Sequence, residues 1–155
     1  MPDFKLTDVS ERPYVYVERT CPMVPASISE EMGEAYADVM AFIQANGLTL
    51  TGPALSVYYA YDPNTVTFRA GFFVSADDAK KASGDIKAGT TPGGRVVNFT
   101  HFGPYSKLSE SYGKLMGWLQ DEGLSLGAPT WEVYVTDPDS TPEEDLRTDI
   151  YVSLA

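Results

Sequence analysis

Few residues in this chain of 155 could do chemistry, and Glu132 is the most informative of them. It lies between Trp131 and Val133, in a run of β-forming residues that is typical of a buried strand. A carboxylate in such a place needs a partner or a chemical task. The bland alternatives are a solvated sheet face or an internal ion pair with one of three arginines, Arg69, Arg95 and Arg147.

Strand geometry places further polar side chains beside this glutamate. Successive side chains of a strand point to opposite faces, so Tyr134 shares the face of Glu132. In the strand expected at 55–59, Ser56 and Tyr58 share one face in the same way. The two tyrosines could line a ligand site, or they could pack on the sheet with their hydroxyls at its edge. The opposite, more apolar face of these strands, which includes Trp131, is expected to pack against the helices.

Other reactive residue types do not form a recognisable site in the sequence. His101 is the only histidine and cannot hold a metal alone. Cys21 is the only cysteine, so it has no internal disulfide partner and no CxxC context, and we expect it to be inert. The sequence has no P-loop, no G-x-S-x-G and no G-x-G-x-x-G after a strand. No cofactor or metal is therefore predicted.

The part of the sequence that contains these residues occurs as two similar copies in the chain. Residues 34–48 align with residues 110–124 at one constant offset, and the match extends to 53–58 and 129–134. The matched pairs include Tyr36 with Tyr112, Met40 with Met116, Gly47 with Gly123, and Tyr58 with Tyr134. The sequence therefore predicts an internal duplication, whose halves should superpose on these pairs.

Each copy predicts the order β-α-β-β. A capping box at 27–30 should begin the first helix, and Gly47 and Gly123 should end the two helices. Strands are expected near 14–17, 55–59 and 68–74, and again near 95–101, 131–135 and 149–154, with turns at 62–64 and 137–140. We therefore expect an α+β fold, a tandem duplication with antiparallel sheets about a pseudo-twofold axis. One domain, 1–155, would comprise repeat one at about 10–75, a linker at about 76–94 with a short helix, and repeat two at about 95–155.

Composition excludes several classes of function. The chain has 22 acidic and 11 basic residues and a formal net charge of -11, so we expect no direct nucleic-acid binding and no duplex binding at physiological salt. No apolar run approaches the roughly 20 residues that span a bilayer. The first residues lack the pattern of a signal peptide. A cytoplasmic location is expected, without membrane association.

Several motifs in the second half resemble the GyrI-like family, which includes effector-binding domains of AraC-type and MerR-type regulators. They are Thr91-Pro-Gly-Gly-Arg-Val96, His101-Phe-Gly-Pro-Tyr105 and Pro129-Thr-Trp-Glu-Val-Tyr134. The resemblance covers nearly the whole chain and implies two β-α-β-β units around an aromatic-lined ligand groove. It also implies that Glu132 meets cationic or polar parts of lipophilic ligands. The implied ligand-binding residues are Glu132, Tyr134, Tyr58, Ser56, Phe102 and Tyr105.

Three functions are compatible with this resemblance. The first is binding of a small lipophilic, cationic organic ligand, as in multidrug binding or sequestration. The second is hydrolysis of reactive cyclopropane-type compounds, with Glu132 activating water and Tyr134 assisting as an acid. The third is an acidic protein-interaction module, such as a gyrase-protecting protein. We expect no DNA-binding domain of a regulator in these 155 residues, because they leave no room for one. Residues 19–25 differ from the His-x-Gly-Pro-Tyr segment of the second half, so we expect an asymmetric pocket. The sequence specifies neither the ligand nor the oligomeric state.

Overall fold

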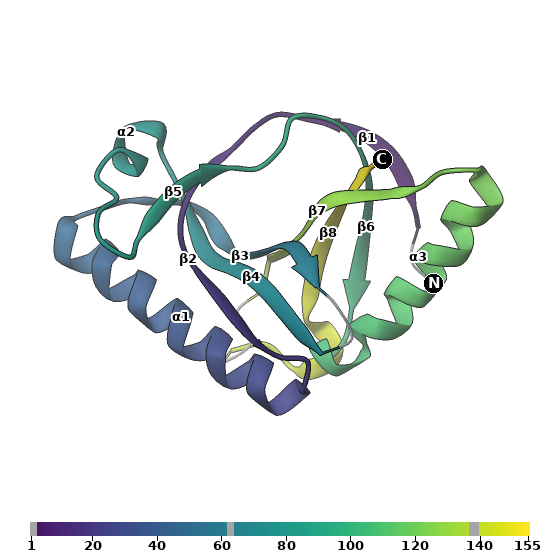
Figure 1. The fold of residues 1–155 in the computed structure, drawn as a ribbon, viewed down its shortest axis with the longest axis horizontal. Coiled ribbons are helices and arrows are strands. Elements are labelled where there is room, and N and C mark those ends of the chain that lie inside the picture. Colours follow the sequence, from purple (N-terminus) through teal and green to yellow (C-terminus); the bar gives the residue numbers. More distant parts are fainter. Residues whose placement is uncertain (1–2, 62–63, 137–139) are drawn as a thin grey trace.

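In the computed structural model, which describes residues 3–61, 64–136 and 140–155, the strands form one antiparallel sheet (Figure 1). Its eight strands are β1 Lys5–Val9, β2 Pro13–Pro22, β3 Leu50–Tyr61, β4 Thr65–Val74, β5 Lys87–Thr90, β6 Gly94–Phe102, β7 Leu126–Tyr134 and β8 Arg147–Leu154. The helices of the described residues are α1 Pro25–Asn46, α2 Ala76–Ala79 and α3 Leu108–Glu122, with 3-10 turns η1 Tyr105–Lys107 and η2 Glu143–Asp145. None of these helices is long and apolar enough to cross a membrane.

The strand order places the two halves of the chain side by side. The order is β1-β6-β8-β7-β3-β4-β2-β5, so β3 and β7 pair at the centre and hold both halves in one sheet, where we expected separate sheets. The register of this central pair sets Ser56 directly opposite Glu132. Each short strand pairs across the halves: β1 with β6, and β5 with β2.

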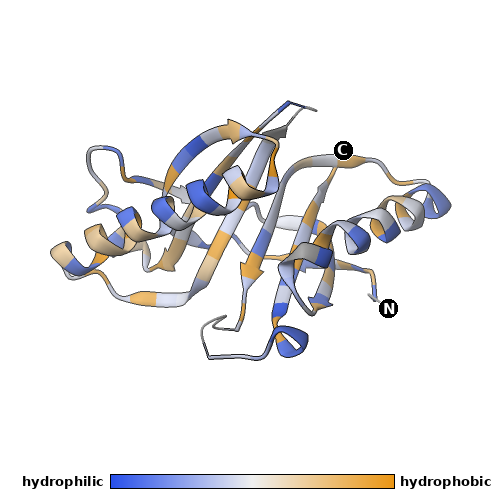
Figure 2. Cartoon of the chain, turned by 90° about the horizontal axis from the view of Figure 1, so that it is seen from below, coloured by the Kyte–Doolittle hydropathy of each residue, from blue (hydrophilic) through white to orange (hydrophobic). Residues whose placement is uncertain are grey.

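The two long helices lie on the same side of the sheet, one over each half (Figure 2). The buried face of α1 packs on β2 and β4 in a cluster that includes Val39, Ile43 and Phe68. The buried face of α3 packs on β6 and β8 in a cluster that includes Leu115 and Phe99. The helix-facing side of β3 and β7 therefore lies between two separate helix-covered cores.

The prediction that the apolar face of the central strands packs on the helices is wrong. Leu55, Val57, Trp131 and Val133 instead form a third cluster with Tyr14, Tyr16, Phe73 and Val96, which contains no helix residue. Phe73 comes from β4, and the other partners come from β2 and β6, which lie near opposite ends of the sheet. The sheet must therefore curl until its outer strands cover its own centre. This curl buries the apolar face of β3 and β7 without a helix. The polar face of the same strands is therefore the one that faces the helices.

The ends of the predicted elements are mostly confirmed. Gly47 and Gly123 end α1 and α3 in the left-handed conformation, with φ of 66° and 70°. The capping box is wrong, because α1 begins at Pro25 and its N-cap, Val24, makes no side-chain capping bond. A proline suits this first position since its missing N–H would have no helical partner. The predicted strands and the linker helix are present, whereas β1 and β5 were not predicted. Of the turns predicted at 62–64 and 137–140, residues 62–63 and 137–139 lie outside the described residues.

Two glycines of α1 should respond in opposite ways to alanine. Gly33 lies within the helix with nothing within 4 Å of an added Cβ, so Gly33→Ala should stabilise the fold by about 0.5–1 kcal/mol. Gly47 has equal space but a positive φ, so Gly47→Ala should destabilise it by about 1–2 kcal/mol. Urea unfolding of both variants checks this pair. Equal effects of the two substitutions would contradict the assignment of the helix end.

Candidate functional site

The centre of the sheet carries two buried polar side chains on the side that faces the helices. Ser56 on β3 is fully buried, and Glu132 on β7 is 5% exposed. They are direct neighbours in the antiparallel register of these strands. A carboxylate and a hydroxyl therefore lie side by side on the helix-facing side of the central strands, and we call this pair the floor of the site.

Tyrosine hydroxyls satisfy the oxygens of this floor. Tyr112 of α3 donates to Glu132 Oε2 at 2.6 Å, and Tyr134 donates to Glu132 Oε1 at 2.8 Å. Tyr134 Oη lies 2.9 Å from Ser56 Oγ, and Tyr36 Oη of α1 lies 2.7 Å from the same atom. The one hydroxyl hydrogen of Tyr134 serves Glu132, and that of Tyr36 serves the carbonyl oxygen of Leu55 at 2.8 Å. Ser56 is therefore left as the donor toward a tyrosine oxygen. The result is one hydrogen-bonded row from Tyr36 to Tyr112.

The side chains around this floor are aromatic and more exposed than it is. Tyr36, Tyr58, Tyr112 and Tyr134 are all partly exposed, whereas the floor residues are buried. Tyr105, in η1, is 36% exposed, and its ring meets that of Tyr134 edge-on at a centroid distance of 5.4 Å. We call the set Ser56, Glu132, Tyr36, Tyr58, Tyr112 and Tyr134 the tyrosine site.

Burial controls the electrostatics of the tyrosine site. Desolvation raises the pKa of Glu132 above its ordinary 4.5, although the hydroxyls of Tyr112 and Tyr134 and the charge of His101 act to lower it. Burial and the nearby carboxylate raise the pKa values of Tyr58 and Tyr134 well above 10.0. The tyrosines therefore remain neutral donors, and the carboxylate lies in surroundings that disfavour its charge.

No arginine neutralises Glu132. Arg69 pairs with Glu18 at 3.4 Å, and Arg147 pairs with Asp149 at 3.1 Å. Among the residues that the structure describes, no Lys, Arg or His side chain lies within ion-pair distance of Glu132. Within the same residues, no group of three His, Cys, Asp or Glu side chains could hold a metal ion.

The structure brings together most of the residues chosen from the sequence. Glu132, Tyr134 and Ser56 share hydrogen bonds, and the ring of Tyr105 contacts Tyr134. Phe102 lies elsewhere: it is 65% exposed and lines surface pockets with Thr100.

Sequence analysis missed Tyr36 and Tyr112 as site residues. They were used as landmarks of the repeat. The signal that could have found them is a hydroxyl-bearing side chain at matching positions in both predicted helices. In the structure each hydroxyl reaches the central strand of its own half, Tyr36 at Ser56 and Tyr112 at Glu132.

The chain matches the GyrI-like small molecule binding domain family over residues 2–155, and it belongs to that family. No curated protein matches it.

Solved structures support the same fold. The EcmrR C-terminal domain matches with a TM-score of 0.81 and 22% identity, covering 100% of this chain and 98% of that one. EcmrR in its complex with DNA matches at a TM-score of 0.84 and 22% identity over 99% of this chain, which spans 57% of the length of that regulator. SAV2435 bound to tetraphenylphosphonium has a TM-score of 0.66 and 14% identity, covering 99% and 94% of the two chains. A hydrolase from Listeria innocua has a TM-score of 0.61 and 16% identity over 98% and 91%.

Proposed function

We propose that this domain binds a lipophilic organic cation over Glu132, in a groove between its two halves. The observation that carries the proposal is a buried carboxylate that is hydrogen-bonded by two tyrosines and has no described cationic partner. A cation bound there would supply the missing positive charge. Tyrosine faces attract cations, and a large organic cation costs less to desolvate than an ammonium group. The tetraphenylphosphonium complex of the similar fold in SAV2435 adds support.

We also infer that the two halves are repeats related by a pseudo-twofold axis, within one domain with the boundaries expected above. The elements β2-α1-β3-β4 and β6-α3-β7-β8 follow the same order. Ser56 and Glu132 occupy equivalent positions in the sequence alignment and are paired with each other in the sheet, which supports an axis between them. Because only one of these two positions is a carboxylate, the site suits a ligand with one cationic centre.

A second candidate function is hydrolysis of a small electrophile. The supporting observation is Tyr134 Oη, 2.8 Å from Glu132 Oε1, which sets an acid beside a carboxylate whose pKa is raised toward that of a useful base. Glu132 would take a proton from water, and Tyr134 would donate one to the leaving oxygen. The third candidate, an acidic protein-interaction module, has the charge of -11 as its support.

Calorimetric titration with a matched pair of ions tests the leading proposal. Tetraphenylphosphonium and tetraphenylborate have nearly the same shape and opposite charge. We expect saturable binding of the phosphonium and at least about 10-fold weaker binding of the borate, since the borate would lie against a carboxylate. Equal affinities, or no binding of either ion, would contradict a cation site. The latter result would favour the protein-interaction module.

A further inference from the structure

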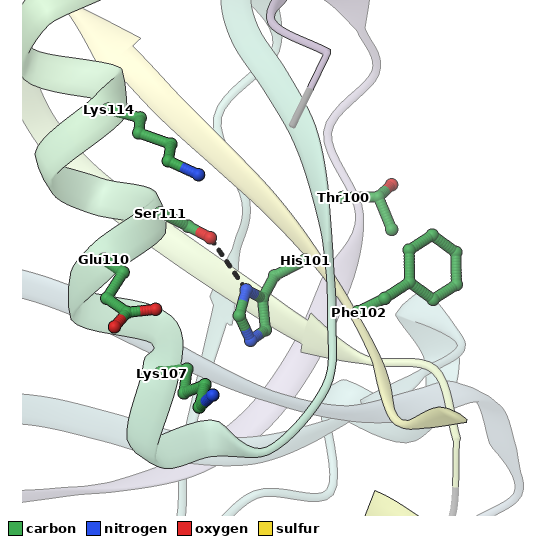
Figure 3. A pocket seen from close by; sticks show the side chains of 7 residues that line it. All are labelled: Thr100, His101, Phe102, Lys107, Glu110, Ser111 and Lys114. Carbon is green, nitrogen blue, oxygen red and sulfur yellow. Dashed lines mark hydrogen bonds between the residues drawn. The ribbon is translucent and has the colours of Figure 1, made fainter. Parts of the chain in front are cut away.

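A second polar cluster lies between β6 and the sheet-facing side of α3 (Figure 3). It opens into a pocket of about 220 Å³. The pocket is lined by Thr100, His101, Phe102, Lys107, Glu110, Ser111 and Lys114. His101 is separated from Tyr134 by β8, with Thr148 between them in the register, so the two clusters are roughly 10 Å apart in the sheet.

His101 and Ser111 are joined by a short hydrogen bond in this pocket. His101 Nδ1 lies 2.7 Å from Ser111 Oγ, and Figure 3 shows the two side chains pointing toward each other from β6 and α3. His101 Nε2 lies 3.2 Å from the carbonyl oxygen of Pro104. A carbonyl can only accept, so in the neutral ring Nε2 carries the hydrogen and Nδ1 accepts from the serine. Both side chains are more than nine-tenths buried, which fixes this arrangement.

The hydroxyl of Ser111 donates to the imidazole of His101, which the carbonyl of Pro104 orients. This is the arrangement of an activated nucleophile. Lys114 follows Ser111 by three residues in α3, so both lie on one helix face. Lys107 lines the same pocket from the start of the helix. Neither lysine is ion-paired with a described residue, so either ammonium group can meet negative charge that develops above the serine.

We propose that Ser111 is a catalytic nucleophile that cleaves small carboxylic esters, with His101 as its general base and Lys114 as the cation that stabilises the oxyanion. Two lysines against the single carboxylate of Glu110 favour an ester that carries an acidic group. None of the three residues Ser111, His101 and Lys114 belongs to the tyrosine site.

The reaction is a two-step acyl transfer to water. Ser111 Oγ bonds to the carbonyl carbon while its proton passes to His101 Nδ1, and the carbonyl electron pair moves onto oxygen beside Lys114. Collapse of this intermediate breaks the bond to the leaving oxygen, which takes the proton from Nδ1. Water then attacks the acyl-serine, giving its proton to Nδ1. The acid leaves, the proton returns to Ser111 Oγ, and the ester and one water have become an acid and an alcohol.

Labelling with a fluorophosphonate tests the proposal without knowledge of the ester. The probe forms a bond from phosphorus to an activated serine and loses fluoride. Peptide mass spectrometry of the labelled full chain should place the adduct on Ser111. His101→Gln should slow labelling by about 100-fold or more, the usual scale for loss of a general base. Lys114→Gln, at an exposed position where folding is not at risk, should slow labelling by about 10-fold or more.

The matched control is Ser109→Ala, since Ser109 is exposed on the same helix. This variant should be labelled at the rate of the original chain. Release of p-nitrophenol from its acetate, followed in the same variants, should show the same order of rates. The proposal is overturned if the original chain takes no label or takes it on residues other than Ser111. It is also overturned if labelling of Ser111 proceeds at equal rates in the Lys114→Gln and original chains, because the bond from His101 to Ser111 would then only fasten α3 to β6.

Discussion

Replacement of Glu132 by glutamine is expected to weaken tetraphenylphosphonium binding by about 10- to 150-fold, or about 1.5–3 kcal/mol. The substitution removes the charge and keeps the shape. A glutamine can still accept from one tyrosine and donate to the other, because Tyr112 and Tyr134 contact different oxygens of the carboxylate. The fold should therefore survive, and the lost affinity should report the carboxylate charge. Calorimetry at fixed salt measures the change.

The control for this variant is Glu122→Gln, which removes the same charge from an exposed position at the end of α3. It should leave the affinity unchanged, since exposed charges beyond a Debye length are screened. If both variants lose affinity equally, the effect belongs to the net charge of the protein and not to the site. Glu132→Gln also tests the second candidate function. In a hydrolase this substitution should lower turnover by about two to four orders of magnitude, more than it lowers binding.

Strand alternation alone was enough to group the floor of the site. A strand has a period of two, so placing Glu132 and Tyr134 on one face required only that residues 131–135 form a strand. The same reasoning placed Ser56 beside Tyr58. Alternation could not say which face meets the helices, because that depends on the curl of the sheet. The apolar face is covered by Tyr14, Tyr16 and Val96, which come from strands distant in the sheet order.

The features that sequence analysis missed depend on pairing between distant segments. β1 and β5 are short strands without strong alternation, and each is held by a strand of the other half. These two segments become strands because of their pairing with β6 and β2, and local sequence does not predict that pairing. Tyr36 and Tyr112 were missed because they served to align the two helices, and helix residues that face a sheet usually belong to the core. Their hydroxyls reach Ser56 and Glu132 because the helix-facing side of β3 and β7 lies between the two helix-covered cores.

Affinity for tetraphenylphosphonium should rise with pH by up to about tenfold per unit below the raised pKa of Glu132, and it should level off above that pKa. Below that pKa the free domain holds a proton on Glu132, since burial favours the neutral acid. A permanent cation favours the carboxylate, so binding must release this proton.

Titrations in two buffers of different ionisation enthalpy measure this proton release directly. Below the raised pKa, up to one proton should leave for each cation bound, and above it none. Glu132→Gln should bind weakly with no slope over the same pH range, whereas Glu122→Gln should keep the slope. An affinity of the original chain that is flat with pH, or that falls as pH rises, would mean that Glu132 does not meet the cation. The pH slope and the loss of affinity on substitution must therefore appear together, because both arise from the charge of one buried carboxylate.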